Sequence, residues 1–132
     1  MKNSKETAIQ LLKDFKGYNY LFGLGVFDQL GEQVATLGRK VLVVADGIEQ
    51  EWAAPVLQKI EENLRLNGIS VLGDFVPGAK PNAPREDVLR IAGKISALKP
   101  DVVVSLGGGS TIDATKAAIA WHALGDVYTD MA

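Results

Sequence analysis

Three consecutive glycines, in the segment Gly107-Gly108-Gly109-Ser110, carry the clearest chemistry in this 132-residue chain. They follow an apolar run at residues 101–106 and lead into a helix that we expect from Thr111 to about Leu124. Glycine lets the backbone approach a ligand where a Cβ atom would collide, and a helix N-terminus attracts anions through its free N–H groups and its dipole. One glycine would serve a plain turn with Ser110 or Thr111 as N-cap. Three favour a phosphate-binding turn, and hence a nucleotide cofactor.

A second glycine motif and an acidic residue fit the same chemistry less specifically. The Gly-x-Gly at residues 23–25 begins like a dinucleotide fingerprint but lacks the third glycine. Asp46 lies 21 residues after Gly25, at the end of the next expected strand. A ribose-binding acid is expected at this place. The alternatives are two ordinary turns, in which Asp46 is a solvated residue that begins the turn with Gly47.

Three polar residues of the last helix have a structural and a functional interpretation. Asp113 and Lys116 are three residues apart and therefore share a helix face. They form either a surface ion pair of little energetic value or a pair that faces the ligand, in which Asp113 accepts and Lys116 donates hydrogen bonds. For His122 we expect a packed or partly exposed structural role, because one imidazole is no metal site.

Alternating strand and helix patterns predict the elements that position these residues. After a leading helix capped by Ser4, strands are expected at 18–22, 41–45, 69–76 and 101–106, and helices at 26–37, 48–66, from Pro84 to about Leu98, and after residue 110. Strands that alternate with helices of this length predict a parallel sheet with helices on both faces, a Rossmann-like α/β domain. Residues 126–132 follow the last helix without a closing strand, so the domain looks incomplete at its C-terminus.

Apolar residues at helical spacing predict which side chains form the core. The expected core positions are Phe27, Leu30, Val34 and Leu37 in the first of the three middle helices, Trp52, Val56, Ile60 and Leu64 in the second, and Val88, Ile91, Ala92, Ile95 and Leu98 in the third. Gly38 and Gly68 are expected to end the first two of these helices.

The composition excludes several classes of function. Hydrophobic residues at 47% and charged residues at 23% are typical of a globular domain. The net charge of −2 gives no reason to expect a nucleic-acid or membrane partner. The absence of cysteine excludes disulfides and thiolate metal sites, and a single histidine excludes a multi-histidine metal site built from this chain alone. Without a signal peptide or a membrane-spanning apolar run, the default location is the cytoplasm.

Four segments together resemble one enzyme family. The sequence GGGSTIDATKAAIA at 107–120 resembles the GGGSxxDxxK signature of iron-containing (group III) alcohol dehydrogenases. The resemblance extends to FGLG at 22–25, LGRKVLVVAD at 37–46 and KPN at 80–82, in the family's order. Glycerol dehydrogenases and dehydroquinate synthase share parts of the glycine signature and remain neighbouring alternatives.

This resemblance implies an NAD(P)-dependent dehydrogenase that interconverts small alcohols with aldehydes or ketones. Carried onto matching positions, Gly107, Gly108, Gly109 and Ser110 would hold the pyrophosphate, and Asp113 would lie near the nicotinamide and substrate with Lys116 beside it. Asp46 would meet the adenosine ribose, where its charge favours NAD over NADP. Asn82 would lie in the cofactor cleft, although the family's commoner pattern has proline directly after the asparagine.

The resemblance also implies a missing part. In the family, one aspartate and three histidines of a helical domain bind Fe²⁺ or another divalent metal, and this sequence ends at Ala132 before any of them. We therefore expect residues 1–132 to form a partial dinucleotide-binding domain without dehydrogenase activity of its own, with alcohols or aldehydes as partners of the complete enzyme only. The alternatives are a non-catalytic nucleotide-binding module, a short subunit completed by another chain, and a truncated product whose open sheet edge drives association. A homo-oligomer is therefore left open.

Overall fold

The computed structural model describes residues 29–124, so the expected leading helix, the strand at 18–22 and the glycines at 23–25 lie outside the described residues. In chain order the elements are α2 (Leu30–Ala35), β1 (Lys40–Ala45), the 3-10 helix η3 (Glu51–Ala53), α3 (Ala54–Leu66), β2 (Ser70–Val71), β3 (Val76–Pro77), α4 (Arg85–Leu98), β4 (Val102–Leu106) and α5 (Gly109–Leu124). This alternation of strands and helices confirms the predicted α/β class.

Strand β1 is the centre of a four-stranded parallel sheet. It pairs along residues 41–45 with the whole of β4. On its other edge it pairs with β2 at residues 40–41 and with β3 at residues 44–45. All three pairings are parallel, so the carboxyl ends of β1, β3 and β4 meet at one edge of the sheet.

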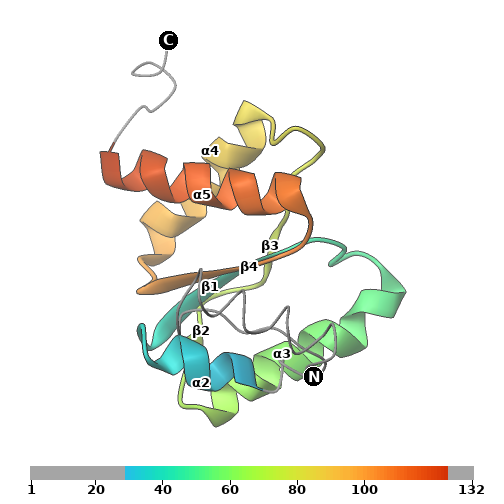
Figure 1. The fold of residues 1–132 in the computed structure, drawn as a ribbon, viewed down its shortest axis with the longest axis vertical. Helices are drawn as coiled ribbons and strands as arrows, with labels where there is room; N and C mark the ends of the chain where they lie inside the picture. The colour runs from blue at the N-terminus through green and yellow to red at the C-terminus, as the bar shows by residue number, and fades with distance from the viewer. Residues whose placement is uncertain (1–28, 125–132) are drawn as a thin grey trace, which may run out of the picture.

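Helices cover both faces of this sheet, as Figure 1 shows with α4 and α5 on one side and α2 and α3 on the other. Successive side chains of a strand point to opposite faces, and the five residues 41–45 of β1 are all fully buried. Leu42 and Val44 pack with the apolar side chains of α4 and α5. Val41, Val43 and Ala45 pack with those of α2 and α3. The run of apolar residues was therefore correctly predicted as a strand buried on both faces.

The helix expected at 48–66 begins only at Ala54, because Pro55 occupies its first turn. Proline has no N–H and clashes inside a helix, but fits at its start. Before it, Gly47 with φ +71° and the η3 turn connect the helix to β1. The prediction that Trp52 and Val56 are buried was consequently wrong, since their side chains are 73% and 45% exposed. Ile60 and Leu64 are buried as predicted.

The strand expected at 69–76 is divided into β2 and β3. Gly73 interrupts the ladder with φ +62°, a conformation that a strand does not use. Leu37 and Leu98, predicted as core residues, are 68% and 36% exposed because they lie just beyond or at the end of their helices. Helix α5 begins at Gly109, two residues earlier than expected.

Of the remaining core predictions, Phe27 lies outside the described residues and Leu30 is only partly buried. Val34, Val88, Ile91, Ala92 and Ile95 are all buried. Gly68 follows the end of α3 with φ +75°, the left-handed conformation that commonly ends helices. None of the helices between residues 29 and 124 has the length and apolar character needed to cross a membrane.

Candidate functional site

The residues with the clearest chemistry gather where three parallel strands end. Asp46 follows β1, Gly78 follows β3 and Gly107 follows β4. Two backbone hydrogen bonds extend the pairing beyond the strands: the Asp46 N–H donates to the Leu106 carbonyl at 2.9 Å, and the Gly78 N–H donates to the Ala45 carbonyl at 3.0 Å. In open α/β sheets, ligands bind in the crevice outside the carboxyl ends of the strands.

The three residues 107–109, here called the glycine turn, have two different reasons to be glycine. A Cβ atom on Gly107 would lie 2.6 Å from the Asp46 Cγ atom, so this glycine makes room for a side chain of the protein itself. A Cβ atom on Gly108 or Gly109 would meet no protein atom within 4 Å. Neither residue has a positive φ angle. The fold therefore does not require these two glycines, and the space before them suits a ligand that approaches the backbone closely.

Asp46 binds the glycine turn directly. Its Oδ2 atom accepts a hydrogen bond from the Gly108 N–H at 2.9 Å, and its Oδ1 atom accepts one from the Thr111 hydroxyl. The sequence predicted Asp46 next to a ribose or as a solvated turn residue, and neither interpretation foresaw these partners. These hydrogen-bond partners could not be predicted from local sequence patterns, because they lie 62 and 65 residues further along the chain.

The loop of residues 78–84, between β3 and α4, is attached to the start of α5 by two hydrogen bonds. The Ala79 N–H donates to the Thr111 Oγ1 atom at 2.8 Å, and the Asn82 N–H donates to the Ser110 Oγ atom at 3.1 Å. Asn82 has φ +68°, a left-handed conformation that asparagine tolerates better than most residues. The structure thus brings Asn82 and Ser110 together, through the backbone of the one and the side chain of the other.

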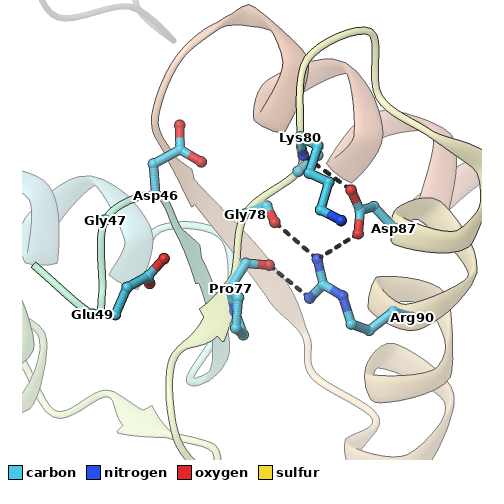
Figure 2. A pocket seen from close by; sticks show the side chains of 9 residues that line it. Asp46, Gly47, Glu49, Pro77, Gly78, Lys80, Asp87 and Arg90 are labelled. Atoms are coloured by element: carbon cyan, nitrogen blue, oxygen red, sulfur yellow. Dashed lines mark hydrogen bonds and ion pairs between the residues drawn. The ribbon is translucent and has the colours of Figure 1, made fainter.

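Arg90 and Asp87 of α4 hold the other side of the same loop (Figure 2). The Arg90 guanidinium donates to the Pro77 carbonyl at 2.7 Å and to the Gly78 carbonyl at 2.8 Å. It also forms an ion pair with Asp87 at 3.3 Å. The Asp87 Oδ2 atom in turn accepts the Lys80 N–H at 2.9 Å. Neither Arg90 nor Asp87 was predicted as part of the site, although their spacing of three is an available signal for a pair on one helix face.

The contacts of Asp87 shift the acidity of its carboxyl group. The hydrogen bond from the Lys80 N–H, with help from the Arg90 guanidinium, holds the pKa of this carboxyl below its usual value. Burial of the residue, which is 8% exposed, opposes this effect without overcoming it. The carboxylate therefore stays ionised at neutral pH and keeps its bonds to the loop.

A cavity of about 350 Å³ opens in front of these groups. It is lined by Asp46, Gly47 and Glu49 of the turn after β1, by residues 77–80, and by Asp87 and Arg90 of α4. Figure 2 shows the carboxylates of Asp46 and Glu49 on one side of the Pro77–Gly78 backbone and the charged groups of Lys80, Asp87 and Arg90 on the other. Such a lining of charged groups and backbone suits a polar ligand better than an apolar one.

None of the predicted site residues of α5, Gly109 and Ser110 included, is among the residues that line this cavity. Asp113 and Lys116 are exposed on the first two turns of the helix, and no ion pair joins them in the described part of the chain. His122 is exposed near the end of α5, where its Nδ1 atom lies 3.1 Å from the Ser96 hydroxyl. Among residues 29–124, no group of three histidine, aspartate or glutamate side chains is arranged to hold a metal ion.

Comparisons with known proteins agree on one family. The family model "Iron-containing alcohol dehydrogenase" matches residues 18–131. Over 84 residues the chain is 32% identical to 1-propanol dehydrogenase PduQ of Citrobacter freundii, a match that covers 63% of this chain and 21% of that protein. Over 109 residues it is 28% identical to methanol:N,N-dimethyl-4-nitrosoaniline oxidoreductase of Amycolatopsis methanolica, covering 81% of this chain and 24% of that protein.

Solved structures give the same result. NADH-dependent butanol dehydrogenase A from Thermotoga maritima matches with a TM-score of 0.68 and 30% identity, over 80% of this chain and 26% of that one. An iron-containing alcohol dehydrogenase from Thermococcus thioreducens matches with a TM-score of 0.67 and 26% identity, again over 80% and 26%. The chain spans about a quarter of the length of these relatives. Since the family model covers most of its residues, the chain belongs to the iron-containing alcohol dehydrogenase family.

Proposed function

We propose that this chain is a dinucleotide-binding part of an alcohol dehydrogenase, and that the glycine turn holds the cofactor's pyrophosphate. The observation that carries this proposal is the open space before Gly108 and Gly109, which a side chain at either position would fill. The N-terminus of α5 faces the same space with its positive dipole end. Membership of the family supports the choice of NAD or NADP as the ligand.

In this proposal the chain's own residues bind and orient the cofactor. The glycine turn fixes the pyrophosphate, and the loop of residues 78–84 forms a wall held in place by Arg90 and by Thr111. When bound, the oxidised nicotinamide would accept a hydride from the alcohol carbon, and the reduced nicotinamide would return one to the carbonyl carbon of the aldehyde or ketone. We further propose that Asp113 and Lys116, which are exposed on the first two turns of α5, lie near the nicotinamide and the substrate.

The substrates that we propose are small alcohols and the matching aldehydes or ketones. This proposal draws on the relatives, whose names refer to 1-propanol, methanol and butanol. Residues 29–124 offer no group of metal ligands, so we assign them no metal-dependent step. For this reason, and because the chain spans a quarter of its relatives' length, we expect no alcohol oxidation from the 132-residue chain alone.

Gly108→Val tests the proposed pyrophosphate site. A valine at this position meets no protein atom near its Cβ, so the variant keeps its fold while its side chain fills the space proposed for the phosphate. We expect NADH affinity, measured by the change in NADH fluorescence on titration, to fall by roughly 100-fold or more, the equivalent of about 3 kcal/mol of lost charge-assisted hydrogen bonding.

Gly93→Val is the matched control. Gly93 lies in the middle of α4, and a Cβ atom there also meets nothing within 4 Å. We expect this variant to bind NADH like the wild type. Equal NADH affinity in the wild type and Gly108→Val, with both proteins folded by circular dichroism, would refute the proposed site.

A finer part of the proposal is that Asp46 favours NAD over NADP. Its carboxylate lines the cavity, where a negative charge repels the 2′-phosphate of NADP. We expect Asp46→Gly to raise the affinity for NADPH relative to NADH by roughly tenfold, the effect of removing one like-charge contact near a protein surface. An unchanged ratio of the two affinities would show that the Asp46 carboxylate does not lie near the 2′ position of the ribose.

A further inference from the structure

The N–H group that a phosphate would use at the glycine turn already has an anionic partner. Gly108 is exposed, and its N–H donates to the Asp46 Oδ2 atom at 2.9 Å. A second acceptor can take this N–H only when the carboxylate moves away, because one N–H donates one strong hydrogen bond. Asp46 therefore occupies the donor that the function proposed above assigns to the pyrophosphate.

Thr111 holds Asp46 at this place. Thr111 is fully buried, and its Oγ1 atom contacts both the Ala79 N–H, at 2.8 Å, and the Asp46 carboxylate. A backbone N–H can only donate, so the hydroxyl oxygen accepts from Ala79 and its single proton goes to Asp46. The attachment of the loop to α5 thus orients the hydroxyl that fixes the carboxylate.

The competition is electrostatic as well as geometric. A carboxylate and a pyrophosphate at the same helix N-terminus repel each other, and both are attracted by the same dipole. The Cβ position of Gly107 shows how closely Asp46 lies against the turn, since any side chain there would overlap the carboxylate.

We propose that Asp46 competes with the cofactor's diphosphate for the Gly108 N–H, and that Thr111 is the positioning residue that keeps Asp46 in the competing place. Thr111 thereby lowers the affinity of the glycine turn for a diphosphate. Binding of a dinucleotide releases the Asp46 carboxylate from the turn, which makes it available to the ribose hydroxyls. This inference rests on the proposed function and adds a residue, Thr111, that sets the affinity of the same site.

The test uses inorganic pyrophosphate, which engages the turn but has no ribose. We expect Asp46→Asn, which removes the charge with little change of shape, to bind pyrophosphate roughly tenfold more tightly than the wild type in isothermal titration calorimetry. Thr111→Val, which keeps the charge but loses the hydroxyl, should bind it roughly fivefold more tightly, because one hydrogen bond to the carboxylate is lost. Thr111→Ser retains the hydroxyl and should restore the wild-type value.

Thr115→Val is the matched control for the buried threonine. Thr115 lies one turn further along α5, is 3% exposed, and donates its hydroxyl to the Thr111 carbonyl at 2.8 Å. It contacts neither Asp46 nor the loop in any hydrogen bond of the described residues. A purely structural role of threonine hydroxyls in α5 would lower the stability of both valine variants without tightening pyrophosphate binding in either.

Each outcome decides the inference. Tighter pyrophosphate binding by Asp46→Asn and Thr111→Val, with Thr115→Val unchanged, supports it. Unchanged or weaker binding by Asp46→Asn shows that the carboxylate shapes the turn rather than competes for it, and overturns the inference even if Thr111→Val does not fold. The proposed function is judged separately, by the NADH affinities of the wild type and Gly108→Val. If neither the wild type nor any of these variants binds NADH or pyrophosphate, both ideas fail.

Discussion

Replacement of Arg90 by methionine should destabilise the domain by about 2 kcal/mol. The Arg90 side chain is about two-thirds buried, and its guanidinium donates to the Pro77 carbonyl at the end of β3 at 2.7 Å and to the Gly78 carbonyl of the loop at 2.8 Å. A hydrogen bond to a charged group contributes about 1.5–3 kcal/mol. Partial exposure allows water to replace part of this gain, and the longer contact to Asp87 at 3.3 Å adds little. Methionine keeps the contacts of the aliphatic part of the side chain, so the loss of unfolding free energy measures the contribution of the guanidinium group.

The effect should appear in global unfolding because the loop is joined to two helices. Besides Arg90 of α4, the Thr111 and Ser110 hydroxyls of α5 bond its backbone. Urea unfolding followed by circular dichroism at pH 7 gives the free energy of unfolding from the midpoint, provided that the slope is unchanged.

Arg65→Met supplies the matched control. Arg65 forms an i,i+4 ion pair with Glu61 at 2.7 Å, but the two side chains are 58% and 38% exposed. We expect a loss of about 0.3–0.5 kcal/mol, which is typical of such helix pairs. If Arg90→Met destabilises the domain no more than Arg65→Met, the argument that Arg90 anchors the loop is refuted.

Two further predictions concern the pH dependence and the core. The pKa of Asp87 is lower in the folded protein than the usual carboxyl pKa near 4. Its contribution to stability is therefore complete above about pH 4 and is lost as the pH falls through the pKa of the folded state. In urea unfolding, Asp87→Asn should cost about 1 kcal/mol at pH 7 and less below pH 4. A constant difference down to pH 3 would contradict this. Leu64→Ala should cost about 2–5 kcal/mol because Leu64 is fully buried, whereas Leu66→Ala, at 86% exposure, should change stability by less than about 0.5 kcal/mol. Equal unfolding free energies of these two variants would refute the assignment of the core.

The parts of the fold that could be predicted are those determined by neighbouring residues. Five apolar residues at 41–45 between charged ones suit a strand buried on both faces, and the structure has one there. The stripe of α4 was predicted from its helical spacing and is buried except at Leu98. The late start of α3 could also have been read from Pro55, a residue whose position inside the expected helix should have moved the boundary.

The site was less predictable because its contacts join residues that are distant in sequence. The three glycines at 107–109 indicate a turn that approaches a ligand closely, but the sequence does not reveal that Gly107 makes room for the side chain of Asp46. The bonds of Asp46 to Gly108 and Thr111 depend on the pairing of β1 with β4. The bonds of Arg90 to the Pro77 and Gly78 carbonyls could not be predicted, because backbone carbonyls carry no sequence signal; only its pairing with Asp87 had one, in their spacing of three.

The most direct test of the central claim, that the glycine turn holds the dinucleotide's pyrophosphate, is an NMR titration of the ¹⁵N-labelled chain with NADH. The account predicts that the largest amide shifts fall on Gly108, Gly109 and Ser110, because phosphate oxygens accept hydrogen bonds from N–H groups at a helix N-terminus. Smaller shifts should appear at the Ala79 amide, because its N–H donates a hydrogen bond to the Thr111 hydroxyl. Binding of NADH that leaves the amides of residues 108–110 unshifted, or no binding at all, would contradict the account.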